Sequence, residues 1–417
     1  MAISVGIFVL ALAAIASERV DRTKAALVGG TLVLLTQSID QHEAIEAIDF
    51  NTIGLLAGMM LMVKLTEGTG VYNYLAIRAG QLSRGRPLAV VASLALTTAV
   101  LSAFLDNLTT VLLVVPITFL LADALDIDPI PLVVIEIITS NIGGTATLIG
   151  DPPNILIAGA TDLSFLDFVV HLAPIAAITL AVVTPLLYAV YRPRLQVADK
   201  ARERVMRLDA GRSIEDRDEL VRTAPVLVLA ILAFFVHKAL HLEPATVALA
   251  GATVMLLVTR VPVERALAGI EWPTLFFFIG LFVMVGALEA NGAIDEVAQG
   301  IGELTAGDRT AEILGITWAS ALGSGVVDNI PFTATMIPVV EQLQGDDGDD
   351  AYWWALAIGA CFGGNATLIA AAANVAAAGM AARSGRPIGF LDFLKIGLPA
   401  TAVSLLLATA YIALRYL

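Results

Sequence analysis

Two short segments rich in glycine and polar residues interrupt long apolar runs, and they constrain the fold of this chain more than any other feature. Residues 141–154 read NIGGTATLIGDPPN, and residues 363–374 read GGNATLIAAAAN. In both, Gly-Gly-x-Ala-Thr-Leu-Ile is followed five residues later by Asn. Gly and Pro oppose helix formation, and a helix break exposed to lipid would leave backbone groups without hydrogen bonds. The two segments therefore predict broken helices that are buried in protein or line a wet cavity.

The composition is that of a membrane protein. Hydrophobic residues make up 58% of the chain and charged residues 15%, whereas soluble domains are about 25% charged. Apolar runs of about 15–20 residues recur along the whole length, which predicts an all-α polytopic membrane protein in the lipid bilayer. Residues 2–16 are apolar, but no basic segment precedes them, so we expect no cleaved signal peptide.

The net charge of −14 lies largely in loops such as 346–350 and indicates a solvated surface. No basic stripe is present, so nucleic acid is excluded as a partner. Cys361 is the single cysteine and cannot form an intrachain disulfide. No nucleotide-binding motif occurs, so we expect neither an enzyme nor a need for an ATPase partner.

The second half of the chain repeats the first at an offset of about 222 residues. Asp106-Asn107 matches Asp328-Asn329, with a proline ten residues after each aspartate. The repeat predicts a first unit at 1–191, a linker at 192–222 and a second unit at 223–417. About ten transmembrane helices are expected, with five spans and one interrupted run in each unit. An odd number of crossings would insert the second unit upside down, which is typical of secondary transporters.

The Lys and Arg residues predict the orientation in the membrane. If the linker 192–222 is cytoplasmic, most other basic residues of the loops also face the cytoplasm; they are Arg19, Arg22, Lys24, Arg84, Arg86, Arg260, Arg265, Arg383 and Arg386. The acidic loops at 40–49 and 345–350 then face outward. The inner membrane of a bacterial cell is the expected location.

Each unit also contains an apolar run interrupted by an Asp-Asn pair, at 88–122 and 311–343. One interpretation is two short spans joined by a turn at the membrane surface. We favour re-entrant hairpins whose tips lie at mid-membrane and meet the broken helices at 131–159 and 353–380. An aspartate at mid-membrane costs about 2.5–3.5 kcal/mol, so two at equivalent positions favour function over packing. Asp106 and Asp328 are therefore candidate proton-coupling groups. Glu136, which has no acidic counterpart in the second unit, is a third candidate.

The candidate substrate and ion site combines the hairpin tips and the broken helices. Its predicted members are Asp106, Asn107, Thr109, Thr110, Asn141, Gly143, Gly144, Thr145, Thr147, Asp151, Asn154, Asp328, Asn329, Thr333, Gly363, Gly364, Asn365, Thr367 and Asn374. Sodium is expected at the two Asp-Asn pairs, and no other cofactor is expected. For Asp151, Asn154 and Asn374 the alternative is that they satisfy backbone groups freed by the break.

At these motifs the chain resembles the ion transporter superfamily. It most resembles the ArsB/NhaD-type branch of arsenite permeases and sodium–proton antiporters, with motifs similar to the melanosomal P protein group and, more distantly, to the divalent anion/sodium symporters. The resemblance implies a homodimer with a scaffold and a mobile, elevator-like transport domain. The symporter relatives carry Ser-Asn-Thr at each tip. The aspartates at 106 and 328 depart from that pattern, which disfavours a dicarboxylate substrate.

Three transport functions remain open. The first is proton- or sodium-coupled movement of a small inorganic ion or metalloid, of the arsenite-efflux type. The second is sodium–proton exchange at the same carboxylates, and the third is sodium-coupled uptake of dicarboxylate or citrate. The duplicated Asp-Asn pairs disfavour a receptor or a structural protein. Hairpins that enter from both faces disfavour a channel.

Overall fold

The computed structural model describes residues 1–17, 19–207, 209–345, 348 and 350–417, and these residues form helices and loops. The helices of the first unit are α1 (Ala2–Ala16), α2 (Arg22–Leu35), α3 (Gln41–Glu46), α4 (Phe50–Glu67), α5 (Val71–Leu82), α6 (Pro87–Phe104), α7 (Asn107–Leu125), α8 (Ile130–Gly144), α9 (Pro152–Ala160) and α10 (Phe165–Tyr191). The linker contains η1 (Arg192–Arg194), α11 (Asp199–Met206) and η2 (Ala210–Ser213). The helices of the second unit are α12 (Arg217–Val236), η3 (Lys238–Leu240), α13 (Pro244–Val258), α14 (Val263–Leu267), α15 (Trp272–Ala290), α16 (Ala293–Thr305), α17 (Arg309–Val326), α18 (Asn329–Gln344), α19 (Ala351–Gly363), α20 (Ala372–Arg383) and α21 (Phe390–Arg415).

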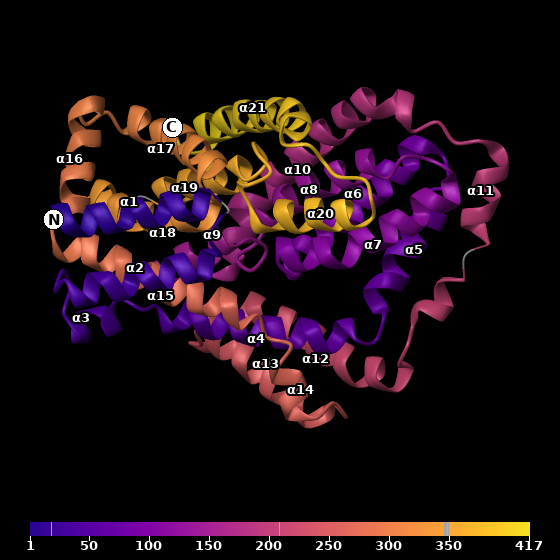
Figure 1. Ribbon diagram of the computed structural model, residues 1–417, viewed down its shortest axis with the longest axis horizontal. Coiled ribbons are helices and arrows are strands. Elements are labelled where there is room, and N and C mark those ends of the chain that lie inside the picture. Colours follow the sequence, from indigo (N-terminus) through magenta and orange to yellow (C-terminus); the bar gives the residue numbers. More distant parts are fainter. Residues whose placement is uncertain (18, 208, 346–347, 349) are drawn as a thin grey trace.

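Helices α12–α21 repeat the order of helices α1–α10, and they repeat several of the same helix-to-helix contacts. Helix α6 packs on α8 as α17 packs on α19, and α1 packs on α2 as α12 packs on α13. Other pairs cross between the units. Helix α2 packs on α15 and α4 on α13, while α9 packs on α18 and α20 on α7. Figure 1 shows α2, α15, α4 and α13 along the lower side of the molecule, with the broken helices α8–α9 and α19–α20 above them.

Seven helical segments among the described residues are long and apolar enough to cross a membrane, and four shorter helices are also apolar. The all-α polytopic membrane fold is therefore confirmed, with fewer full-length spans than the ten predicted. Several spans are short: α2 has 14 residues and α13 has 15. At 1.5 Å per residue these helices are about 21–23 Å long, less than the ~30 Å hydrocarbon core.

The interrupted runs break where the Asp-Asn pairs stand. Helix α6 ends at Phe104 and α7 begins at Asn107, while α17 ends at Val326 and α18 begins at Asn329. The arms of the first hairpin have 18 and 19 residues, so they are longer than the predicted run 88–122 allowed. The two arms of the second hairpin have 18 and 16 residues.

Helix α12 begins at Arg217, within the segment 192–222 that was predicted as the linker. The side chain of Asp216 accepts a hydrogen bond from the backbone N–H of Glu219 at 2.9 Å and so caps the helix. The expected acidic loop at 345–350 falls partly outside the described residues, which omit 346, 347 and 349.

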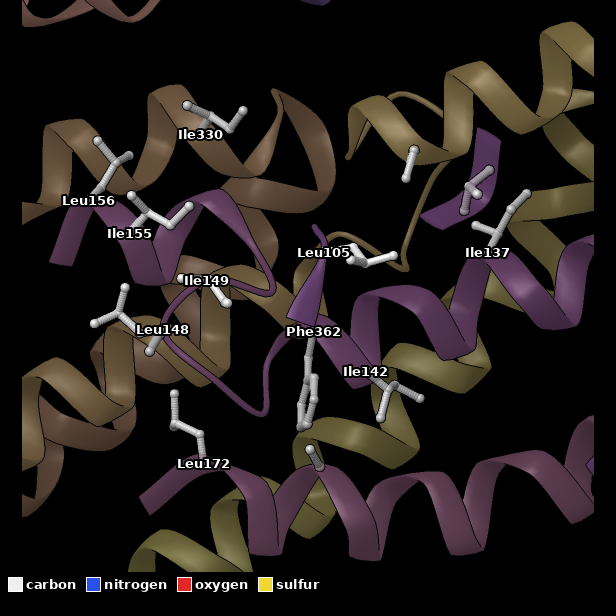
Figure 2. Close-up of a cluster of buried hydrophobic side chains, with 14 of the residues drawn as sticks. Leu105, Ile137, Ile142, Leu148, Ile149, Ile155, Leu156, Leu172, Ile330 and Phe362 are labelled. Atoms are coloured by element: carbon white, nitrogen blue, oxygen red, sulfur yellow. The ribbon is translucent and has the colours of Figure 1, made fainter. Parts of the chain in front are cut away.

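Buried aliphatic and aromatic side chains surround the first broken helix. Figure 2 shows Ile142, Leu148, Ile149, Ile155 and Leu156 along α8, the break and α9, with Leu105, Leu172, Ile330 and Phe362 contributed by other elements. The ten labelled residues are all at most 5% exposed. This apolar shell holds the unwound segment inside the protein, where its backbone must find hydrogen-bond partners in the protein itself.

Candidate functional site

At both hairpin tips an aspartate with positive φ caps the helix that follows it. Asp106 and Asp328 have φ values of 104° and 154°, a region that side-chain-bearing residues rarely adopt. The Asp106 carboxylate accepts from the backbone N–H of Thr109 at 2.8 Å, and the Asp328 carboxylate accepts from Ile330 N–H at 2.9 Å. Each aspartate therefore caps the second arm of its hairpin and places a negative charge at a helix N-terminus.

The broken helices are held open by two equivalent asparagines. The Asn154 side chain donates to the carbonyls of Thr145 and Thr147, at 3.1 and 2.8 Å. The Asn374 side chain donates to the carbonyls of Gly364 and Thr367, at 2.7 and 2.8 Å. These bonds satisfy carbonyl groups that the break leaves without helical partners. Asn154 and Asn374 thus support backbone groups freed by the breaks.

Hydroxyl groups tie each broken helix to the first arm of its own hairpin. Thr147 donates to the carbonyl of Ala103, and Thr367 donates to the carbonyl of Gly325 at 2.8 Å. Ser102 and Ser324 make the matching bonds in the other direction, each at 2.7 Å to a carbonyl of the neighbouring broken helix. The hairpins and the broken helices are therefore joined into one unit in each repeat.

Two of the predicted glycines allow close helix packing. A Cβ atom at Gly143 would lie 2.3 Å from the carbonyl oxygen of Ala99, and one at Gly363 would lie 2.5 Å from that of Ala321. Helices α8 and α19 can approach α6 and α17 this closely only without side chains at these positions. Gly143 and Gly363 shape the site without needing to contact a ligand.

Asp151 lies where both hairpin tips meet the first broken helix. The side-chain amide of Asn107 donates to its Oδ1 atom at 3.1 Å, and the amide of Asn329 donates to the same atom at 3.0 Å. Asp151 is fully buried, and the two asparagines are at most 4% exposed. The crossed packing of α9 on α18 accounts for this meeting, because it brings the start of α9 to the start of α18.

Asn141 connects this centre to the second broken helix. Its side-chain oxygen accepts from the Asn107 side chain at 3.1 Å, and its side-chain nitrogen donates to Asn365 at 3.0 Å and to Asn374 at 3.1 Å. Four helices, α7, α9, α18 and α20, begin around this network. Helix N-termini favour negative charge, which allows a carboxylate to be buried there.

Among the described residues, Asp151 Oδ2 and Asn365 Nδ2 of this network and Thr110 Oγ1 on α7 are buried polar atoms without a hydrogen-bond partner. An unsatisfied buried group costs about 1–3 kcal/mol. The set contains one donor, one acceptor and one hydroxyl that can act as either. It can therefore bind a proton, a cation or a small polar species.

The remaining predicted residues take local roles. Thr145 donates to the Asn141 carbonyl and Thr333 to the Asn329 carbonyl, at 2.8 and 2.7 Å, as helical residues do. Thr109 donates its hydroxyl to Asp106 at 2.6 Å. A Cβ atom at Gly144 would lie 2.6 Å from the carbonyl oxygen of Gly150. The backbone carbonyl of Gly364 accepts a hydrogen bond from the Asn374 side chain.

Glu136 lies apart from the central hydrogen-bond network. It is fully buried on α8 and accepts from the hydroxyl of Thr118 on α7, and its Oε2 atom has no hydrogen-bond partner among the residues that the structure describes. Among the described residues, no group of three or more His, Cys, Asp or Glu side chains is arranged to hold a metal ion.

Sequence reasoning missed two residues beside the centre. Cys361 occupies the position in α19 that Asn141 occupies in α8, and its thiol lies 3.7 Å from Asn154 Oδ1. The alignment of the two repeats could have identified Cys361 as the counterpart of Asn141. Arg22, predicted as a loop residue, begins α2 and lies 3.8 Å from Asp328. No local motif marks Arg22, because the contact spans more than 300 residues.

Arg22 and Asp328 also line a cavity of about 420 Å³. Leu108 of the first tip and Ile369 of the second break contribute to the same walls. Both tips and the second broken helix therefore face a space large enough for a small solute.

Comparisons with known proteins agree with the fold and with the transporter prediction. The sequence pattern of the CitMHS family, described as citrate transporter, matches residues 12–359. The chain is 44% identical over 422 residues to the uncharacterized transporter Rv2684 of Mycobacterium tuberculosis, covering 99% of this chain and 98% of that protein. It is also 34% identical over 505 residues to the P protein of Homo sapiens, covering all of this chain and 59% of that longer protein. The similarity to the P protein group is confirmed.

A solved structure shares the fold. The YdaH transporter of Alcanivorax borkumensis matches with a TM-score of 0.63 and 17% identity, covering 92% of this chain and 88% of that one. The family pattern spans most of the chain, and the matches extend across both repeats. The protein is therefore an integral membrane transporter, and the chain belongs to the CitMHS citrate transporter family.

Proposed function

We propose that this protein is a secondary active transporter in which Asp151 exchanges a proton or a sodium ion as substrate crosses between the hairpin tips. The convergence of Asn107 and Asn329 on one oxygen of Asp151, with its other oxygen unpartnered, carries this proposal. A nearby cation favours an ionised carboxylate and burial disfavours it, so occupancy by substrate can drive uptake or release of a proton.

The same geometry supports alternating access. Asp151 joins the two hairpins, and the hydroxyl bonds join each hairpin to its broken helix. These elements can therefore move together against α2, α4, α13 and α15 as an elevator-like transport domain. We further propose a homodimer in the bacterial inner membrane with the linker in the cytoplasm, in keeping with the superfamily resemblance.

A small neutral or cationic inorganic species, such as undissociated arsenous acid, is the substrate that the side chains favour. Asp106, Asp151 and Asp328 contribute three carboxylates around the centre, and Arg22 is the guanidinium beside them. A dianion would have to overcome this negative charge. Neutral hydroxyl-bearing species match the free Asn365 and Thr110 groups.

Citrate or another organic anion is the second candidate. The family match favours it. The four helix N-termini around the centre and the guanidinium of Arg22 are the groups that would bind carboxylates.

Transport in proteoliposomes loaded with a pH-sensitive dye tests both candidates. Sodium, arsenite, succinate and citrate are offered in turn to the wild type and to Asp151→Asn. Arsenite-dependent proton movement that is lost in Asp151→Asn supports the first candidate, and proton movement with sodium alone indicates sodium–proton exchange. Citrate or succinate uptake without arsenite transport establishes the second. Asp392→Asn, at an exposed residue paired with Lys395, is the control.

The same assay separates the coupling groups. Asp106→Asn, Asp328→Asn and Glu136→Gln each remove one of the other predicted proton sites. If Asp106→Asn and Glu136→Gln keep coupled transport while Asp151→Asn loses it, Asp151 is the coupling carboxylate. If Asp151→Asn transports like the wild type, the proposal is wrong.

A further inference from the structure

The aspartates of the two hairpin tips, although related by the repeat, have different partners. At the first tip, Thr109 of the same helix donates both its backbone N–H and its hydroxyl to Asp106, at 2.8 and 2.6 Å. At the second tip, the residue equivalent to Thr109 is Pro331, which has neither donor. Asp328 instead lies 3.8 Å from the guanidinium of Arg22 on α2.

Arg22 also contacts α15. Its guanidinium lies 5.4 Å from the ring centre of Phe277 and 3.5 Å from the Thr274 hydroxyl, both on α15. The equivalent position at the start of α13 is Pro244, so the first tip has no matching arginine. The ion pair is an asymmetric link between the α2–α15 pair and the second hairpin, in addition to the packing of α15 on α18.

The pair lies at the wall of the 420 Å³ cavity, where a cation could reach Asp328 and the guanidinium could withdraw. The Asp328 side chain is 8% exposed and that of Arg22 is 25% exposed. Two acidic residues lie near Arg22: Asp21, which also lines the cavity, and Glu271, which accepts a hydrogen bond from the Thr274 hydroxyl. Both are acidic, so they can retain the guanidinium after it leaves Asp328.

We propose that Arg22 is a tethered counter-ion that holds the second hairpin against α2 and α15, and that a monovalent cation bound at Asp328 displaces it and frees the hairpin to move. This inference rests on the proposed function for the identity of the cation. It assigns Arg22 a positioning role that links ion binding to movement of the transport domain.

Cross-linking measures the link without requiring transport. Val20 and Val327 line the same cavity, one beside Arg22 and the other beside Asp328. In the Val20→Cys, Val327→Cys protein, a short bis-maleimide reports how often the two segments are close. The native Cys361 is buried, and the protein without added cysteines measures its background.

Arg22→Gln should lower the cross-linking rate about fivefold, the factor that corresponds to about 1 kcal/mol for a partly exposed ion pair. Asp328→Asn should lower it equally, and the double variant no further, because both remove one interaction. Arg19→Gln, an exposed residue of the same loop, is the matched control and should leave the rate unchanged. Replacing choline chloride with sodium chloride should lower the rate in the Arg22 protein and not in Arg22→Gln.

Unchanged cross-linking in Arg22→Gln, or an equal loss in Arg19→Gln, would overturn the tethered counter-ion. A sodium effect that persists in Arg22→Gln would overturn displacement by the cation. If cross-linking behaves as expected and liposomes move neither protons nor substrate, the link stands and the proposed function fails. If transport is coupled and the cross-linking rate is the same with and without Arg22, the proposed function stands and the tethered counter-ion is wrong.

Discussion

Asn107 and Asn329, 222 residues apart in the sequence, donate to the same oxygen of Asp151 at 3.1 and 3.0 Å. One carboxylate thus contacts both hairpin tips. The repeat places Ala371 where Asp151 stands in the first unit, so the centre has one such carboxylate and not two. A change in its charge or occupancy acts on both hairpins at once.

Substitutions at Asp151 should separate its structural and chemical roles. Asp151→Asn retains a carbonyl oxygen that can accept from both asparagines, so the thermal stability of the purified protein should change little. Asp151→Ala removes the shared acceptor of both asparagine side chains, although Asn107 keeps its bond to Asn141, and should lower the free energy of unfolding by about 1–3 kcal/mol. Thermal unfolding in detergent measures both variants. Equal stability of the two would show that the hydrogen bonds at Asp151 do not hold the tips.

Replacing Gly143 or Gly363 with alanine should destabilise the protein, because the added methyl group would meet a backbone carbonyl at 2.3 or 2.5 Å. Overpacking of this kind costs about 1–3 kcal/mol. Gly315→Ala on α17 is the matched control, since nothing lies within 4 Å of its added Cβ atom, and it should be neutral or slightly stabilising. If Gly143→Ala is as stable as Gly315→Ala, the close approach of α8 to α6 is not required.

The cap at the first hairpin tip should be sensitive to side-chain chemistry. Asp106→Ala loses the bonds from Thr109 and keeps the unfavourable positive φ, so it should cost about 1–2 kcal/mol. Asp106→Asn retains an acceptor for the bonds from Thr109, so it should cost less. Chemical denaturation of the two variants, compared with the wild type, checks the order.

The buried pair of Glu136 and Thr118 should behave as one unit. Thr118→Val leaves the Glu136 side chain without its partner and should be destabilising by about 1–3 kcal/mol. Adding Glu136→Leu should recover most of that loss, because an apolar pair leaves no unpaired polar group. A double-mutant cycle on unfolding stability measures the coupling. Additive effects would contradict a direct bond.

Much of the candidate site could be predicted from local patterns. The paired segments at 141–154 and 363–374 and the Asp-Asn tips identified nearly all residues that the structure brings together. The patterns could not assign a separate role to each of these residues. Asn154 and Gly143 look alike as candidates, yet one supports freed carbonyls and the other permits close packing. These roles depend on partners from other helices.

The sequence by itself determined the helical membrane fold, the internal repeat and the positions of the breaks. Hydrophobic runs, glycines and prolines act through the local chain, and a duplicated motif is visible without coordinates. Only the tertiary structure decided that Asp151 is the shared acceptor and that Arg22 neutralises Asp328. Both contacts arise from helices that cross between the two units, and the partners of a buried charge depend on packing at long sequence separation.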